Sequence, residues 1–453
     1  MQPKLLSFLA AAIVSVMTIA LAPSRATAEA VTSFELTNGL TVVVVPDKRL
    51  PVVTHMVFYR VGSTDEPRGK SGLAPLLEHL MFKATDRIAS GEFARVISRI
   101  GGNDNAITGA DTTYYYQRVA KRHIHRVMQL EADRMLGLKL DAMEIKTELD
   151  VVAEERRLRI ESEPVAILSE QMVSILYANH PYRISGFGWP HELAALTKAD
   201  AETFYRQHYA PNAAVVVVAG DVTEQEVRDL AHATYGALPA RKLAERVRIT
   251  EPAPRAARRV VMYEPRTPTA TMARMYATVS DVTATGNEAE ALEVLARVLG
   301  SGDTSRLAEA LILQSKKARA AAAIYSANAR DGGRFTVFAV PAPGIAPGDI
   351  EADLDAVILK LLADGPTEAE VEQARAGARA KMVFDADSQF ERAKRIGESM
   401  AHGLPLAHIN AGEARLASVT RDDVVLAARK HLRLVASVTG WVLPEAVPSA
   451  KAQ

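Results

Sequence analysis

The order of predicted elements in the first half of the chain recurs in the second half, and this limits the possible folds more sharply than any single segment. Residues 34–63 hold two adjacent strand-like runs, and helical patterns follow over 73–85 and 91–100. Residues 258–280 again hold two strand-like runs, and helical patterns follow over 288–313. Strands, helices and further strands in each half predict an α+β fold made by duplication.

A segment rich in proline and charge separates the two halves. Residues 241–258 show little periodicity, as is typical of a linker. We therefore predict an N-terminal domain over 29–240 and a C-terminal domain over 259–445, with 446–453 as a tail. Each domain then has about 200 residues, which lies within the usual range for one domain.

The first 28 residues have the pattern of a secretory signal. Lys4 precedes an apolar run from Leu5 to Ala22, and Ala26 and Ala28 form a small-residue cleavage site. We expect cleavage after Ala28, a periplasmic or secreted protein, and no membrane span in the mature chain. The alternative is an uncleaved membrane anchor, because an apolar run of about 18 residues can just cross a bilayer.

Composition restricts the chemistry that the chain can perform. It has no cysteine, so disulfides and thiolate ligands are excluded, and a metal site must use histidine and carboxylates. Lys and Arg number 54, as do Asp and Glu, so there is no basic excess of the kind that binds a phosphate backbone. Nucleic acid is therefore not an expected partner.

Glu78 and His79 lie in the first predicted helix and form part of a metal motif. In the pattern H-x-x-E-H, two histidines four residues apart share one helical face and hold a zinc ion, while the glutamate reaches the metal-bound water. Pro75 stands here at the first histidine position. Further along, Glu148 and Glu155 are seven residues apart and share one face of a later predicted helix.

The chain resembles the pitrilysin, insulin-degrading-enzyme and mitochondrial-processing-peptidase family, in which a glutamate ligand follows the inverted zinc motif by about 76 residues. His79 and Glu155 have this spacing. The resemblance covers nearly all of the mature chain, through segments such as NGLTVVVVPD, EHLMFKAT, GGNDNAITGADTTYYY and YAPNAAVVVVAGDV. It implies two homologous domains, each an antiparallel-rich sheet covered by helices, which together form half of a clamshell.

The resemblance also implies roles for four side chains and a zinc cofactor. Glu78 corresponds to the general base, His79 and Glu155 to two zinc ligands, and Glu148 to a carboxylate that supports them. Catalytic zinc generally takes three protein ligands, and proline has no side-chain donor, so only two ligands remain. We expect Pro75 to impair the metal site but to leave the helix intact, because proline is tolerated in a first helical turn.

Other histidines do not have the spacing that would replace the missing ligand. His55, His123 and His125 are the nearest in sequence, and none is related to His79 by the four-residue step of the motif. One of them could complete the site only through a tertiary contact.

Positions that contact a substrate peptide are implied by the resemblance as well. Asn105 and Ala106 match the edge strand on which the family holds a peptide by strand addition. Tyr325, Arg330 and Arg334 lie where the family contacts substrate carbonyls, and they are further candidates without a fixed register.

Two functions fit this pattern. The first is a non-catalytic, peptide-holding subunit of a peptidase complex, either a homodimer or a heterodimer with an intact homologue. The second is an active zinc endopeptidase that hydrolyses peptides or small unfolded proteins, with Glu78 as general base. Pro75 favours the first function, whereas the retained Glu78 and Glu155 favour the second. Whether the chain is an enzyme therefore depends on one ligand position.

Overall fold

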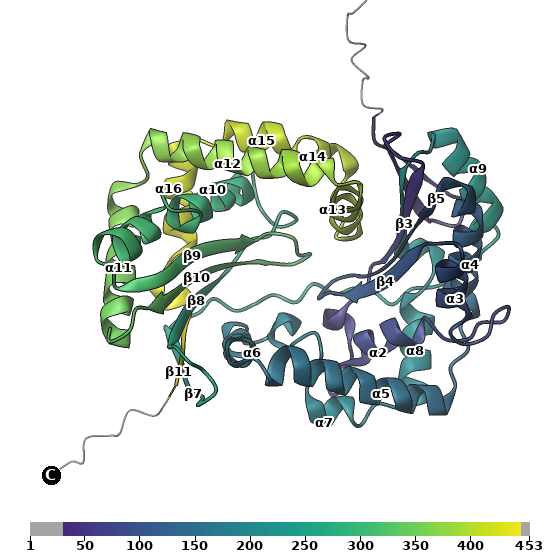
Figure 1. Ribbon diagram of the computed structural model, residues 1–453, viewed down its shortest axis with the longest axis horizontal. Coiled ribbons are helices and arrows are strands. Elements are labelled where there is room, and N and C mark those ends of the chain that lie inside the picture. Colours follow the sequence, from purple (N-terminus) through teal and green to yellow (C-terminus); the bar gives the residue numbers. More distant parts are fainter. Residues whose placement is uncertain (1–29, 445–453) are drawn as a thin grey trace, which may run out of the picture. The chain divides into compact units, whose positions relative to one another are not determined.

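The computed structural model describes residues 30–444, which form two α+β domains around one mixed sheet each (Figure 1). The predicted signal peptide over 1–28 and the predicted tail over 446–453 lie outside the described residues. None of the helices between residues 30 and 444 is both long and apolar enough to cross a membrane.

Six strands make up the first sheet: β1 (Thr32–Glu35), β2 (Thr41–Pro46), β3 (Val52–Tyr59), β4 (Asn103–Thr108), β5 (Thr113–Ala120) and β6 (Ala214–Gly220). Their spatial order is β1-β2-β6-β3-β5-β4, with β2 and β6 parallel and the other pairs antiparallel. Every residue of β6 is buried, as expected of a strand that is covered on both faces. The two opening strands, expected to be adjacent, are separated because β6 returns between β2 and β3.

The second sheet repeats this arrangement with β7 (Arg258–Tyr263), β8 (Thr271–Thr278), β9 (Ala318–Ser326), β10 (Gly333–Pro341) and β11 (Ser437–Leu443). Its order is β7-β11-β8-β10-β9, and β7 and β11 run parallel as β2 and β6 do. The second sheet thus reproduces the order of the first without β1. The topology confirms the duplication predicted from the order of elements.

Helices cover both sheets. Those of the first half are α2 (Leu73–Leu80), α3 (Glu92–Arg99), α4 (Ile124–Gly137), α5 (Ala142–Arg156), α6 (Pro164–Leu176), α7 (Pro190–Leu193), α8 (Lys198–His208) and α9 (Glu224–Thr234). Those of the second half are α10 (Glu288–Gly300), α11 (Pro347–Asp364), α12 (Glu368–Asp387), α13 (Gln389–Ala401), α14 (Leu406–Asn410), α15 (Gly412–Ser418) and α16 (Arg421–His431). Two further segments, Arg157–Glu161 and Ala308–Gln314, are π-helical.

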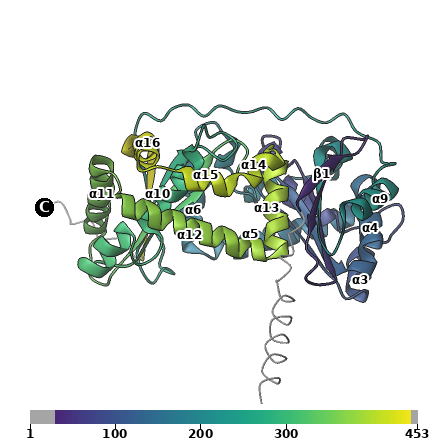
Figure 2. The same cartoon turned by 90° about the horizontal axis from the view of Figure 1, so that it is seen from above.

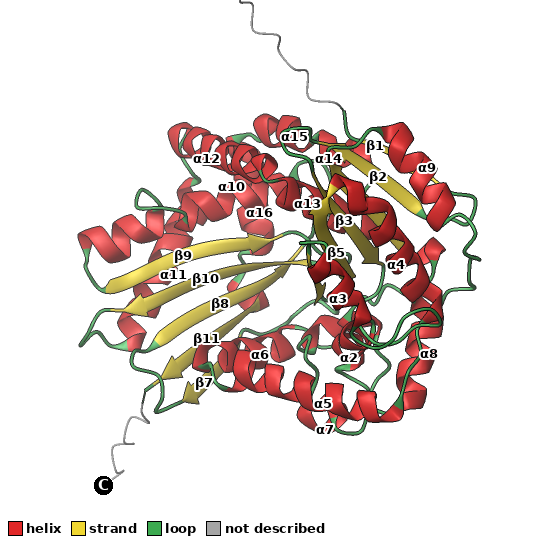
Figure 3. Cartoon of the chain, turned by 45° about the vertical axis from the view of Figure 1, so that its right-hand side comes forward, coloured by secondary structure: helices red, strands yellow, loops and turns green. Residues whose placement is uncertain are grey.

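One helix from each half packs on the sheet of the other half (Figure 3). Leu168 and Met172 of α6 join an apolar cluster with β8 and β11. Ala393 and Ile396 of α13 join the apolar cluster formed by β2, β3 and β6. Residues 239–257, which contain neither helix nor strand, connect the two halves as an extended segment (Figure 2).

Candidate active site

The helix that carries the Glu-His pair begins at a turn that favours glycine. Gly72 caps α2 with φ 93°, a left-handed conformation. Pro75 is the third helical residue, so its missing N–H is one that would have no partner within the helix. The Glu66 carboxyl oxygens accept hydrogen bonds from Gly72 N at 3.1 Å and Ala74 N at 2.7 Å. The expectation that the helix tolerates the proline is confirmed.

Two glutamates of α5 flank the imidazole of His79. Glu148 Oε2 lies 3.0 Å from His79 Nδ1, and Glu155 Oε2 lies 3.6 Å from His79 Nε2. Residues seven apart project from one face of a helix, which explains why both carboxylates reach the same ring. Lys83 Nζ lies 2.5 Å from the second oxygen of Glu148. The imidazole is therefore held between two carboxylates, one of which is neutralised by a lysine.

Strand β4 forms an edge of the first sheet beside this group. Its only strand partner among residues 30–444 is β5. Asn105 is exposed, and its Oδ1 accepts a hydrogen bond from Ala106 N at 2.9 Å. At the end of the strand, Thr108 interacts with the Glu78 carboxyl. The edge strand and the Glu-His pair therefore belong to one site.

These elements enclose a single cleft with a volume of about 650 Å³. Clefts of this size are typical of ligand and peptide sites. The three defining positions of the motif, the two distal glutamates and the predicted edge segment all lie on its wall. The lining residues are Pro75, Glu78, His79, Phe82, Lys83, Asn105, Ala106, Ile107, Thr108, Glu148, Glu155, Arg159, Gly186 and Phe187.

The electrostatics of the cleft follow from these contacts. The hydrogen bond to His79, together with Lys83, lowers the pKa of Glu148 to about 2 although partial burial opposes the shift. Burial disfavours the charged form of His79, but Glu148, Glu155 and Glu78 outweigh it and raise the pKa of the imidazole. Burial also raises the pKa of Glu78, against the hydrogen bonding of the adjoining strand. The imidazole is thus biased towards its protonated form by the carboxylates around it.

Comparison with known proteins places the chain in a family. The sequence model described as "Insulinase (Peptidase family M16)" matches residues 41–188, and the one described as "Peptidase M16 inactive domain" matches residues 195–378. An uncharacterized zinc protease of Mycobacterium bovis is 30% identical over 441 residues, which cover 93% of this chain and 94% of that protein. The chain belongs to peptidase family M16.

Two further matches come from Helicobacter pylori. Its zinc protease PqqE is 28% identical over 417 residues, which cover 91% of this chain and 92% of that protein. The crystal structure of a protease from the same organism superposes with a TM-score of 0.84 at 29% identity and covers 92% of this chain and 100% of that chain. The predicted family and the two-domain M16 fold are both confirmed.

The side chains in the cleft do not fit a three-ligand zinc site. Zinc is the metal expected of the M16 family, because these relatives are named zinc proteases. His79 Nε2 and Glu155 converge, but Pro75 offers no donor atom at the position of the third ligand. Between residues 30 and 444, no three or more His, Asp or Glu side chains are arranged so that they could hold a metal ion.

The other histidines lie away from the cleft. His55 is fully buried in β3, where its Nδ1 is 3.0 Å from Gln117 Oε1 and its Nε2 is 3.0 Å from the Tyr235 hydroxyl. His123 and His125 lie at the start of α4, and neither lines the cleft that contains Glu78 and His79 (the M16 cleft). None of these three imidazoles is placed to replace the missing ligand.

The three candidates in the second half also lie outside this cleft. The Tyr325 hydroxyl donates a hydrogen bond to the Val279 carbonyl at 2.8 Å, and the ring lines a different pocket. The backbone N–H of Arg330 donates to Asp111 Oδ2 at 3.0 Å, which ties the loop before β10 to the first half. Arg334 lies near the start of β10. A substrate-binding role for these residues remains a prediction.

Several residues that line the M16 cleft were not predicted from the sequence. Lys83 lies beyond the end of α2 at Leu80, and its ion pair with Glu148 of α5 depends on a tertiary contact that no local spacing marks. Thr108, Arg159 and Phe187 come from elements that only the tertiary fold brings together, and no local pattern marks them.

Proposed function

We propose that this M16 protein is exported and holds peptides without hydrolysing them, as a catalytically impaired subunit of a peptidase complex. The observation that carries the proposal is Pro75, which removes one zinc ligand from a cleft that otherwise retains the predicted residues. Lys83 and His79 neutralise Glu148 within the chain. These internal ion pairs give the cleft a stable arrangement of charges that does not require a metal ion.

The edge strand supports the peptide-holding part of the proposal. β4 has an unpaired side, and an extended peptide can add to such an edge through backbone hydrogen bonds. Ala106 N is held by the neighbouring Asn105 side chain, an interaction that an incoming carbonyl can displace. The side chains of Ile107 and Phe187 provide apolar surface in the same cleft.

Export and pairing rest on the sequence. The apolar run and the cleavage pattern before residue 29 support a periplasmic or secreted protein. A subunit that holds peptides without hydrolysing them needs a partner that performs the hydrolysis. We therefore expect a heterodimer with a homologue that has an intact H-x-x-E-H, or otherwise a homodimer. Size-exclusion chromatography of the purified chain, alone and with such a homologue from the same genome, tests this part; two independent monomers would contradict it.

The catalytic part is tested by restoring the ligand. Pro75→His should gain about one tightly bound zinc ion per chain and hydrolyse an unfolded peptide, because it completes the three-ligand set. Metal analysis and a fluorogenic peptide assay measure both properties. Pro75→Ala is the matched control, since it also removes the proline but adds no donor. Stoichiometric zinc and turnover in the unaltered chain would disprove the proposal.

Peptide holding is tested separately at the edge strand. Ala106→Pro removes one N–H from an edge strand, and it should weaken binding of an unfolded peptide by about tenfold, the equivalent of one hydrogen bond of about 1.4 kcal/mol. Fluorescence polarisation with a labelled peptide measures the change, and Ala106→Gly, which keeps the N–H, should bind as the unaltered chain does. Equal binding by both variants would mean that the peptide does not use this edge.

A second function is favoured by the retained geometry. Glu78, His79 and Glu155 line one cleft, as they would in an active endopeptidase with a weakened metal site. Metal addition distinguishes the two functions. Peptide hydrolysis by the unaltered chain that rises with added zinc and disappears in Glu78→Gln would establish the active enzyme.

A further inference from the structure

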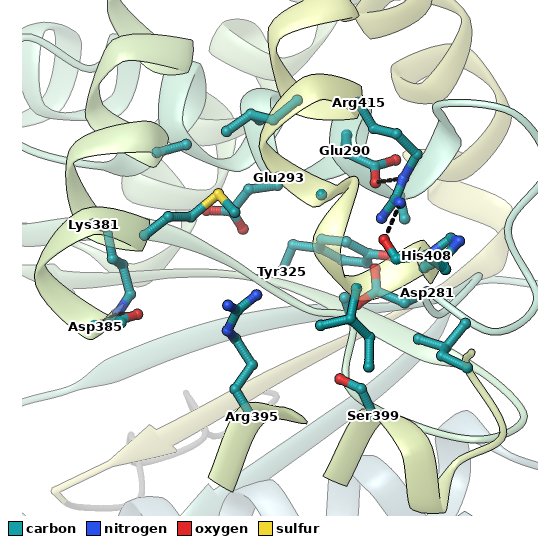
Figure 4. A pocket seen from close by; sticks show the side chains of 18 of the residues that line it. Asp281, Glu290, Glu293, Tyr325, Lys381, Asp385, Arg395, Ser399, His408 and Arg415 are labelled. Carbon is teal, nitrogen blue, oxygen red and sulfur yellow. Dashed lines mark hydrogen bonds and ion pairs between the residues drawn. The ribbon is translucent and has the colours of Figure 1, made fainter. Parts of the chain in front are cut away.

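A second pocket lies in the other half of the molecule, with a volume of about 280 Å³ (Figure 4). It is formed by α10, the end of β9, α12, α13, α14 and α15. None of its residues belongs to the cleft that contains Glu78. What it binds is therefore independent of the function proposed for that cleft.

The duplication makes this pocket the counterpart of the first cleft. In the first half, the walls are the helix that follows β3 (α2), the edge strand (β4) and a long helix packed on α2 (α5). In the second half, the corresponding walls are α10, the edge strand β9 and α12, which packs on α10. The arrangement of helices and edge strand that forms the M16 cleft in the first half therefore forms a pocket in the second half, lined by different side chains.

Most charges in the second pocket neutralise one another. Arg415 Nε lies 2.6 Å from Glu290 Oε1, and Arg297 Nε lies 2.9 Å from Glu293 Oε1. A third pair lies within α12, where Lys381 Nζ is 2.8 Å from Asp385 Oδ2. These pairs fix the walls and leave no net charge among themselves.

Two opposite charges remain unpaired in the pocket. The Arg395 guanidinium of α13 makes no hydrogen bond or ion pair with any residue between 30 and 444, and Figure 4 shows it pointing into the pocket. The Asp281 carboxylate likewise has no hydrogen-bond or ion-pair partner in that range, although it is partly buried. Burial and the nearby Glu290 raise the pKa of Asp281 to about 6, so an added cation would stabilise its charged form.

We propose that this pocket binds a zwitterion with an apolar side chain, namely a free α-amino acid or a dipeptide. Arg395 holds the carboxylate and Asp281 holds the ammonium group. Met382, Leu404 and Ile409 line the same pocket and provide apolar surface for the side chain. A volume of 280 Å³ corresponds to roughly nine water molecules at about 30 Å³ each, which matches a ligand of this size.

Isothermal titration calorimetry of the full-length mature chain with leucine and with leucyl-leucine tests the proposal. At least one of them should bind. Arg395→Ala and Asp281→Asn should each weaken binding by at least about tenfold, as expected for the loss of one charge-assisted hydrogen bond. Arg392→Ala is the matched control, because it removes another arginine of α13 that does not line the pocket.

The ligand chemistry is tested with blocked compounds. N-acetyl-leucine lacks the ammonium group and leucinamide lacks the carboxylate, so both should bind at least about tenfold more weakly than leucine. Binding should persist in His79→Ala, whose side chain lies in the other cleft. The proposal is overturned if neither ligand binds, if either blocked compound binds as tightly as leucine, or if Arg395→Ala and Asp281→Asn bind normally while their circular dichroism shows a native fold.

Discussion

Pro75 places a side chain without a donor atom in the cleft but leaves α2 intact. The N–H that proline lacks would have no hydrogen-bond partner within the first turn of this helix. Glu66 supplies the hydrogen bonds that this turn does need, through Gly72 N and Ala74 N. A proline at this position therefore has little cost in folding. A proline later in α2 would remove a backbone hydrogen bond and displace His79.

We therefore expect Glu66 to contribute more than Pro75 to the stability of α2. Glu66→Ala removes both accepted hydrogen bonds, and losses of helix caps cost about 0.5–2 kcal/mol. We expect a lower midpoint of thermal unfolding in Glu66→Ala, and an unchanged midpoint in Pro75→Ala. Calorimetry measures both. A stable Glu66→Ala would mean that water replaces the carboxyl group at the helix start.

A second prediction at this scale concerns pH. Arg306 forms two hydrogen bonds with Glu370, at 2.7 and 2.9 Å, and this contact holds the pKa of Glu370 at about 2. The usual value of 4.5 applies in the unfolded chain, so the unfolded state binds more protons between these values. The contribution to stability is complete above pH 4.5 and is lost as the pH falls towards 2.

Glu370→Gln should therefore lower the unfolding midpoint at pH 7 but have little effect near pH 2. A difference of about 1 kcal/mol corresponds to a few degrees, roughly 2–4 °C for a domain of 150–250 residues. Thermal melts of both proteins across this pH range measure the difference. Equal differences at both ends of the range would show that the Glu370 charge contributes nothing.

At the scale of elements, α6 and α13 depend on close contacts between a helix and the sheet of the other half. Gly397 of α13 faces Phe58 so closely that a Cβ would lie 2.1 Å from the ring. Gly440 of β11 faces Met172 of α6, and a Cβ there would lie 2.2 Å from the sulfur. Glycine at these positions lets a backbone approach the neighbouring element.

The two glycines should respond differently to alanine. Gly397→Ala meets a rigid aromatic ring and should cost about 1–3 kcal/mol, whereas Gly440→Ala meets the flexible Met172 and should cost less. Gly377→Ala, in α12, is the control, because its new Cβ meets only the end of Arg297. Chemical denaturation ranks the three variants. If Gly397→Ala lowered the free energy of unfolding no more than Gly440→Ala does, α13 would be able to shift on the first sheet at little cost.

The repeated elements could be predicted from the sequence because they depend on local patterns, whereas the grouping of the motif residues with Glu148 and Glu155 was implied by the family resemblance. The motif residues and the two glutamates of α5 follow from helical spacing, and β5 follows from its run of aromatic residues. The position of β6 between β2 and β3, and the exchange of α6 and α13, depend on contacts between residues more than 100 positions apart. No periodicity within a short window contains that information.

At the scale of the whole molecule, the exchanged helices and a polar cluster join the two halves. Asp111 of the first half accepts hydrogen bonds from the Tyr182 hydroxyl at 2.6 Å and from Arg330 N of the second half at 3.0 Å. Arg246, in the connecting segment, forms two hydrogen bonds of 2.8 Å with Asp65. Neither half buries its apolar faces without the other.

We therefore expect the two halves to fold together. Residues 29–240 expressed alone would expose the apolar face of α6, and residues 259–445 alone would expose that of α13, so each should be insoluble or aggregated. Co-expression should recover a soluble complex, which size-exclusion chromatography would detect. A soluble, monomeric and cooperatively folded fragment would contradict this expectation.

The exchange of helices also bears on how such a chain could arise. Two copies of a half-length chain, each lending one helix to the sheet of its twin, would bury the same faces with no covalent connection. In that arrangement, the extended segment over 239–257 adds a tether that Arg246 anchors to Asp65. Once the halves are fused, each can change separately, and one can keep the remains of a metal motif while the other fills the equivalent position with ion pairs.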